Sequence, residues 1–233
     1  MMQTLNTYYD VTLTVMPFLA RGFVETLRIS FASIIAGSLL GFTIGLIRSY
    51  KVPVINVLLG AYIHFLRGTP FLVQLYLFYF VLPNTNVSWL SWDSQTAAFI
   101  TLTVYTSSYV AEITTGAIKS VAREQWEAAA AIALNRYQTM RLVILPQALR
   151  LIIQPMSGVY VILIKSTAII SVVGIAELTR QGEQLIITYP NHLLYIYSLI
   201  AVIYFIYCYP VLRFARWLET KVRDRTSAAS SSA

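Results

Sequence analysis

The sequence has 233 residues, of which 57% are hydrophobic and only 12% are charged, and its formal net charge is +7. A soluble domain carries about 25% charged residues, so this composition argues against a water-soluble fold and for a surface that faces lipid. The basic residues lie between apolar segments, so membrane topology explains them more simply than nucleic-acid binding does. Cys208 is the single cysteine, which excludes an intrachain disulfide.

Five apolar segments are long enough to cross a bilayer, which requires about 20 apolar residues in a helix. In chain order they lie at about 29–47, 53–82, 95–113, 150–174 and 192–212, and the second is interrupted by HFLRGTP. Each segment alone is also compatible with a buried helix of a soluble protein, but five in so short a chain favour a membrane protein. The predicted fold class is an all-α membrane protein with five transmembrane helices.

Positive charges alternate between the two ends of these segments. Basic residues gather after the first segment, between the third and fourth, and after the fifth, whereas the loops at 83–94 and 175–191 are poor in cations. The positive-inside rule then places the N-terminus outside and the C-terminus in the cytoplasm. The N-terminal 15 residues have no basic n-region, so we expect no cleaved signal peptide.

The stretch EQWEAAAAIALNRYQTMRLVILP at 124–146 is unusually polar for this chain and falls on the predicted cytoplasmic side. Its alanines favour a short helix that ends near Leu134, and Asn135 with Gln138 forms a capping-box pattern that starts a second helix at about 136–143. Pro146 fits the first turn of the next transmembrane helix. The stretch therefore predicts a helix–turn–helix elbow. One interpretation is an ordinary solvated loop. A partner with a groove better explains its five apolar side chains, namely Trp126, Leu134, Tyr137, Met140 and Leu142.

This stretch resembles the EAA loop of ABC-importer permeases, in which EAA is followed by three residues, Gly, nine residues and Ile-x-Leu-Pro. Glu127, Ala128 and Ala129 match its start, and Leu145 with Pro146 matches its end. Ala133 stands where the family has Gly, so we expect Asn135, which tolerates left-handed geometry, to take part in the turn. Further segments such as HFLRGTPFLVQLYLFYF and LIKSTAIISVVGIAEL are similar to the polar amino acid branch of these permeases.

The resemblance implies an ABC type I importer permease fold with a cytoplasmic coupling helix, in a bacterial cytoplasmic (inner) membrane. It implies a transmembrane domain at 20–222, with the EAA loop at about 123–146, between an extracytoplasmic segment at 1–19 and a disordered tail at 223–233. The implied partners are a second permease, identical or homologous, a cytoplasmic ATPase dimer, a periplasmic or lipid-anchored solute-binding protein, and an amino-acid substrate. The residues implied in coupling are Glu127, Ala128, Ala129, Ala133, Asn135, Leu145 and Pro146.

Polar residues inside the predicted spans are candidates for the substrate pathway because ionisable groups are expensive there. The break in the second segment is one candidate, because Pro70 frees carbonyls that could line a cavity and Gly68, Thr69 and Gln74 lie around it. A packing kink, with Arg67 bound to a neighbouring carbonyl or carboxylate, is an equal alternative.

The other candidates are Glu112 in the third segment and Lys165, Ser166 and Thr167 in the fourth. A structural ion pair between Glu112 and Lys165 and a pathway lined by the latter three residues are both compatible with this pattern. Gly37, Gly41 and Gly45 follow a small-residue spacing and predict a close helix contact. The tyrosines of the fifth segment are expected to pack or face lipid.

Chemical motifs bear on the class of function. The sequence has no GxxxxGK[ST] phosphate loop, and His64 and His192 lie far apart. We therefore expect no enzyme activity and no metal or cofactor in this chain, with ATP and Mg²⁺ bound by the partner ATPase. The leading hypothesis is a permease subunit of an amino-acid ABC importer. A self-contained oligomeric channel is the alternative from a different class, but it leaves the elbow without a purpose.

Overall fold

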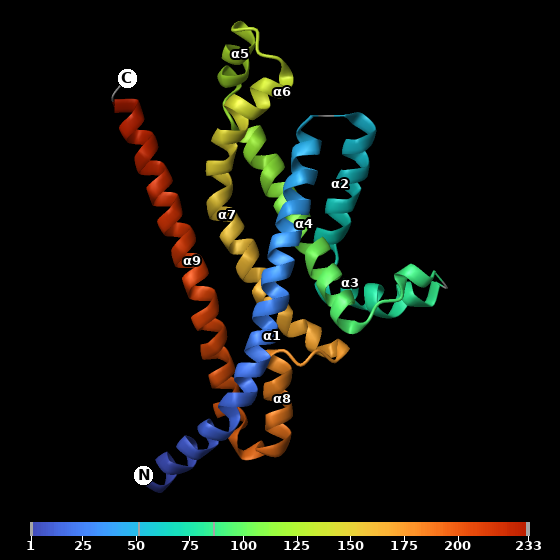
Figure 1. Ribbon diagram of the computed structural model, residues 1–233, viewed down its shortest axis with the longest axis vertical. Coiled ribbons are helices and arrows are strands. Elements are labelled where there is room, and N and C mark those ends of the chain that lie inside the picture. The colour runs from blue at the N-terminus through green and yellow to red at the C-terminus, as the bar shows by residue number, and fades with distance from the viewer. Residues whose placement is uncertain (1, 51, 86, 232–233) are drawn as a thin grey trace. The chain divides into compact units, whose positions relative to one another are not determined.

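The computed structural model describes the backbone of residues 2–50, 52–85 and 87–231, and side chains from residue 8 to 221 within these ranges. Every element that it describes is helical (Figure 1). The α-helices are α1 (Met2–Ser49), α2 (Pro53–Gly68), α3 (Phe71–Tyr76), α4 (Ser94–Ser120), α5 (Arg123–Ala131), α6 (Arg136–Gln138), α7 (Leu145–Ser166), α8 (Leu178–Thr188) and α9 (Leu193–Ser231). A π-helix at Thr139–Ile144 joins α6 to α7, and a 3₁₀-helix at Thr167–Val173 follows α7.

The chain divides into two compact units, and each is described separately. The first unit contains Met1–Ser33, Phe71–Leu102 and Leu163–Tyr209. The second contains Ile34–Pro70, Thr103–Ile162 and Pro210–Ala233. The long helices α1, α4, α7 and α9 each contribute to both units, because each crosses one of these boundaries.

Three helical segments are long and apolar enough to cross a membrane, namely Tyr8–Ser49, Arg136–Val173 and Pro190–Lys221. The pair Pro53–Gly68 and Phe71–Thr85, counted together as one broken span, would make a fourth. Helix α4 covers the remaining predicted segment, but its many hydroxyl residues lower its hydropathy and it is not among these segments. Composition and length thus support three or four of the five predicted spans.

Two helix ends differ from the predicted boundaries. The first predicted segment, at 29–47, is the second half of the 48-residue helix α1. The backbone of α9 is helical to Ser231, whereas the sequence predicts disorder at 223–233; residues 232 and 233 lie outside the described part. An alanine-containing tail extends an existing helix without a new nucleation cost, which explains this continuation. The division into an N-terminal segment, a transmembrane domain and a tail stays a prediction.

In the second unit, three glycines allow α1 and α4 to pack backbone against backbone. A Cβ atom added at Gly37, Gly41 or Gly45 would lie 2.9, 2.5 or 2.9 Å from the carbonyl oxygens of Thr103, Ser107 and Ala111, respectively. Both series advance in steps of four in the same direction, so these two helix segments run parallel. The predicted close contact of the glycine face is confirmed as a contact within the chain.

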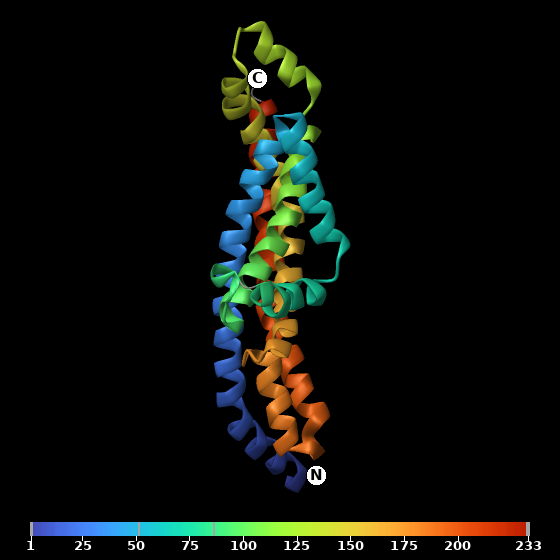
Figure 2. The same ribbon diagram turned by 90° about the vertical axis from the view of Figure 1, so that its right-hand side faces the viewer.

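Each unit has its own apolar core. In the first unit, the start of α1 packs against α8 and the start of α9 through Val15, Leu19, Leu178 and Ile196, which are all fully buried. In the second unit, the end of α4 packs against the π-helix and α7 through a cluster that contains Ile118, Val121, Met140, Ile144 and Ala148. This second cluster supports the elbow formed by α5 and α6, which both views show beyond the adjoining ends of α4 and α7 (Figures 1 and 2).

Candidate functional site

The elbow begins with α5, whose two faces differ in exposure. Ala129 is 3% exposed, and Trp126 packs against the apolar cluster at the end of α4. Glu127 and Ala128 lie on the exposed face, and the Glu127 Oε1 atom accepts a 2.8 Å hydrogen bond from Arg123 Nε. One turn of α5 therefore combines an inward side that fixes the helix and an outward side that a partner can reach.

The turn after α5 is a Schellman motif with alanine in the left-handed position. The amide of Ala133 donates to Ala130 O at 2.9 Å, and the amide of Leu134 donates to Ala129 O at 3.1 Å. Ala133 has a φ of 58°, and it is the one described non-glycine residue with a positive φ. The motif normally places Gly at this position. The turn is thus formed, although Ala133 stands where the sequence pattern places glycine.

This geometry corrects the expectation that Asn135 takes over the left-handed role. Asn135 has φ −72° and ψ 166°, which is extended backbone, so it does not share the positive φ. Its role is the predicted capping box: Gln138 N donates to Asn135 Oδ1 at 2.9 Å, and Asn135 N donates to Gln138 Oε1 at 3.0 Å. The predicted break between the two helices is confirmed, and the strain is at Ala133.

Ala133→Gly is expected to raise the free energy of unfolding by about 1 kcal/mol, because glycine adopts a positive φ without the steric cost of a Cβ atom. Ala130→Gly, within regular α5, is the matched control and should lower it by about 1 kcal/mol. Thermal unfolding in detergent micelles measures both. Equal destabilisation by the two substitutions would contradict the left-handed assignment.

The exit of the elbow is continuous helix rather than a second break. The expected helix at 136–143 passes through the π-helix Thr139–Ile144 directly into α7, so Pro146 lies inside one helical run. Pro146 is the second residue of α7, so it lies in the first turn of that helix as predicted, where its missing N–H costs least. Leu145 is half-buried and Pro146 is exposed.

The apolar surface of the elbow differs from the predicted set. Met140 is 5% exposed and Trp126 packs inward, so both belong to the chain's own core. The large exposed apolar side chains are Ile132, Tyr137 and Leu142, with exposed fractions of 71%, 61% and 62%. Ile132 is not among the five predicted side chains, although an isoleucine just before a predicted turn is a signal for an exposed contact. We call Glu127, Ala128, Ile132, Tyr137 and Leu142 the elbow surface.

Glu112 belongs to a cluster of charges in the second unit. Its Oε2 atom lies 3.1 Å from Arg48 Nη1 and its Oε1 atom lies 3.8 Å from Arg67 Nη1. The Arg67 guanidinium also lies over the Tyr109 ring, 5.3 Å from its centroid. Both carboxylate oxygens thus face arginines, a different pairing from the suggested pair with Lys165. Arg67 is thus bound to a neighbouring carboxylate, as in the packing alternative for this break.

The remaining pathway candidates differ in exposure. Gly68 is exposed, and Thr69 ends α2 with its hydroxyl donating to Phe65 O at 2.9 Å. In the first unit, Gln74 is 1% exposed, Thr167 is fully buried, and Ser166 is 8% exposed. Lys165 is exposed. The structure therefore does not bring these described residues together in a common site within either unit. Of these residues, Gly68 and Lys165 are exposed.

A buried carboxylate that the sequence analysis missed begins α8. Glu177 is fully buried and accepts hydrogen bonds from the amides of Thr179 and Arg180, at 2.9 and 2.7 Å, and from the Tyr204 hydroxyl at 3.1 Å. Burial raises the pKa of Glu177, and the amide hydrogen bonds partly oppose this shift. The hydroxyls of Tyr195, Tyr204 and Tyr207 all have partners in the first unit, which confirms packing roles for these tyrosines.

Glu177→Ala is expected to lower the free energy of unfolding by about 3 kcal/mol, because it leaves two buried amides without an acceptor and removes one hydrogen bond of the Tyr204 hydroxyl. The native pKa of Glu177 lies above its usual 4.5, so the native state binds this proton more tightly than the unfolded chain. The contribution of Glu177 to stability therefore falls as the pH rises from about 4.5 through the native pKa. Denaturant titrations across this range should show a flatter pH dependence for Glu177→Gln, and an unchanged slope would contradict the assignment.

Comparisons with known proteins identify the family of this chain. Residues 33–224 match the family model described as "Binding-protein-dependent transport system inner membrane component". The glutamine transport system permease protein GlnP of Escherichia coli (strain K12) is 37% identical over 207 residues, which cover 89% of this chain and 94% of GlnP. The probable amino-acid ABC transporter permease protein YckA of Bacillus subtilis (strain 168) is 36% identical over 205 residues, covering 88% and 89%.

A solved structure shows the same fold. The crystal structure of an amino acid ABC transporter with histidines matches with a TM-score of 0.82 and 31% identity, covering 90% of this chain and 96% of that chain. The fold is therefore the ABC type I importer permease fold. The family model covers more than half of the sequence. The chain therefore belongs to the family of inner membrane components of binding-protein-dependent transport systems, as a permease of the amino-acid ABC transporter type.

Proposed function

We propose that this chain forms, with a second identical or homologous permease, the pathway by which a polar amino acid enters the cell, and that the elbow couples this pathway to a cytoplasmic ATPase dimer. The observation that carries the proposal is the elbow surface, which presents one carboxylate on α5 and three large apolar side chains on the turn, α6 and the π-helix. An apolar surface with a single charge suits a groove on a soluble partner.

The rigidity of the elbow supports a mechanical role. The Schellman turn, the capping box and the inward side of α5 each fix the elbow on the apolar cluster of the second unit. Movement of a docked ATPase would then displace α5 and α6 as one body and pass to α4 and α7, which adjoin them in sequence. Coupling requires such a packed element with two positions. Glu127, Ala128, Ala129, Ala133, Asn135, Leu145 and Pro146 are the residues proposed for coupling.

The proposed topology has five spans, with the N-terminus outside and the C-terminus in the cytoplasm. The parallel direction of the α1 and α4 segments supports it, because spans one and three must run the same way.

The relatives are named for glutamine and for other amino acids, which supports an amino-acid substrate. Lys165 is the strongest candidate for meeting the substrate carboxylate, because its side chain is exposed. Gly68, Thr69, Gln74, Glu112, Ser166 and Thr167 are proposed to shape the same pathway.

Co-purification tests the proposal. The tagged permease should retain the ATPase subunits encoded with it in detergent, and ATP hydrolysis should rise when the cognate solute-binding protein and its amino acid are added. A ligand screen on that solute-binding protein identifies the amino acid. Passive amino-acid flux through the reconstituted permease alone, without ATP, would instead support a self-contained channel.

A further inference from the structure

The second unit contains a cavity that the coupling role does not explain. Its volume is about 460 Å³, and it lies where the ends of α1 and α4 meet the elbow. Four basic side chains line it, namely Arg48, Lys119, Arg123 and Arg136, and no acidic side chain does. The cavity therefore gathers positive charge from four separate elements.

Two of these charges have no acidic partner. Arg48 is bound to Glu112 at 3.1 Å, and Arg123 is bound to Glu127 at 2.8 Å. Lys119 and Arg136 are exposed and form no ion pair among the side chains that the structure describes. Only 16% of the Arg48 side chain is exposed and Glu112 neutralises it, so the unneutralised charge of the cavity comes from Lys119 and Arg136. Such an arrangement attracts an anion.

The floor of the cavity is apolar. Ile118, Val121 and Met140 line it and are 3, 7 and 5% exposed, and Tyr50 and Trp126 add aromatic walls. A small soluble anion gains nothing from this floor, because it has no apolar part to bury. A phospholipid combines an anionic phosphate with apolar chains, and it matches both the rim and the floor. Tyrosine and tryptophan are also the residues enriched at the membrane–water interface.

The start of α5 borders the cavity, and its first turn carries the acidic residue Glu124. Ala122, at the N-cap, provides no side-chain hydrogen bond to the first turn of this nine-residue helix, and Val121 and Arg123 on either side line the cavity. The free amides of a helix N-terminus favour a phosphate. This feature adds to the basic rim and points to the same class of ligand.

We propose that this cavity binds the headgroup of an anionic phospholipid, with Lys119 and Arg136 as its phosphate-binding side chains. The inference rests on the proposed orientation, which places this end of α4 at the cytoplasmic leaflet, where anionic lipid attracts clustered cations. A lipid bound there touches α1, α4 and the elbow together, and it braces the elbow against the spans.

Binding of a fluorescent phosphatidylglycerol to the purified full-length chain in detergent micelles tests the proposal. We expect saturable binding that exceeds the binding of the matching phosphatidylcholine probe. Lys119→Gln/Arg136→Gln should weaken phosphatidylglycerol binding about tenfold or more, because each cation near an anionic lipid contributes appreciably. Lys119→Arg should retain it, and each single Gln substitution should give an intermediate loss.

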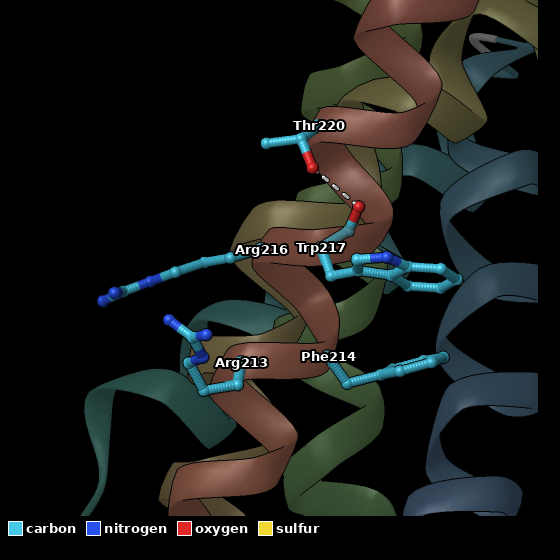
Figure 3. Close-up of a pocket in the computed structure, with 5 residues that line it drawn as sticks. All are labelled: Arg213, Phe214, Arg216, Trp217 and Thr220. Atoms are coloured by element: carbon cyan, nitrogen blue, oxygen red, sulfur yellow. Dashed lines mark hydrogen bonds between the residues drawn. The ribbon is translucent and has the colours of Figure 1, made fainter.

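The matched control removes two other arginines at the same proposed side of the membrane. Arg213 and Arg216 project from one side of α9, whereas Phe214 and Trp217 project from the other (Figure 3). Arg213→Gln/Arg216→Gln changes the net charge by the same amount and should alter phosphatidylglycerol binding less than twofold. Equal losses in the two double variants would overturn the proposal, because general charge would then explain the binding.

Two further competition measurements distinguish a bound lipid from other possible occupants of the cavity. Inorganic phosphate at millimolar concentration should leave the lipid bound, and displacement would overturn the assignment to lipid in favour of a soluble phosphate. Addition of the ATPase should also leave the lipid bound, and its displacement would assign the cavity to an acidic surface of that partner. Lipid binding is measured on the chain alone, so the outcome of this test does not depend on ATPase retention or on transport.

Discussion

Glu127→Arg is expected to reduce ATP-driven uptake to below about 1% of the wild-type rate while the permease stays folded in the membrane. Truncating or reversing one charge of a desolvated pair across an interface costs 2–5 kcal/mol or more, which is about 30-fold to several thousand-fold. The Glu127 side chain is 63% exposed in the chain alone, so folding does not depend on it. Uptake of labelled amino acid into proteoliposomes that contain the whole complex measures the effect.

The control for Glu127→Arg exchanges the two charges of α5. Arg123→Glu/Glu127→Arg restores an ion pair at the same i,i+4 spacing, so it recovers the few tenths of a kcal/mol that the pair gives the helix. If Glu127 acts on the ATPase, uptake stays lost in this double variant. Recovery of uptake would show that the single substitution acts by weakening α5, and unchanged uptake in Glu127→Arg would refute the coupling role.

Gly41→Leu is expected to prevent the second unit from folding. A Cβ atom at Gly41 would lie 2.5 Å from Ser107 O and 2.6 Å from Val110 Cβ, and a backbone carbonyl has no rotamer by which to move away. The larger side chain must separate α1 from α4, with a loss of about 4 kcal/mol or more. The measurement is the yield of monodisperse protein after extraction from the membrane.

Alanine substitutions separate packing from helix propensity at this contact. Gly41→Ala gains about 1 kcal/mol of propensity but costs about 1–3 kcal/mol by overpacking, so the net effect is destabilising. Gly116 also lies in α4, and nothing lies within 4 Å of a Cβ atom added there. Gly116→Ala should therefore stabilise by about 1 kcal/mol. Thermal unfolding that shows stabilisation by both substitutions would contradict the close contact.

Local signals in the sequence predict much of the elbow. The capping box involves residues three apart, so Asn135 and Gln138 identify the start of the second helix without knowledge of the fold. The turn itself was misassigned because Ala133 is a poor residue for a positive φ, and the preference of asparagine pointed to the wrong position. The hydrogen bonds of the Schellman turn, together with the helices on both sides, hold alanine in a conformation that its own preference does not favour.

Contacts between distant segments account for what the sequence does not predict. Glu112 finds Arg48 and Arg67 because α1 and α2 pack beside α4, a choice that spacing within one helix cannot reveal. In the sequence, Glu177 resembles an ordinary loop carboxylate. Its burial results from contacts with Tyr204 and with the start of α8, which the sequence does not reveal. The hydropathy of α4 gives a weak signal for a span because its polarity comes from hydroxyls such as those of Thr101, Thr106 and Ser107, which are buried within the chain.

The central claim is that this chain is a transport subunit driven through its elbow by ATP hydrolysis. The most direct test is accumulation of labelled amino acid in proteoliposomes that contain the permease, the ATPase and the solute-binding protein, with and without ATP. We expect accumulation against a gradient only with ATP and only with an intact elbow surface. Equilibration of the amino acid without ATP, at the same rate in Glu127→Arg, would contradict it.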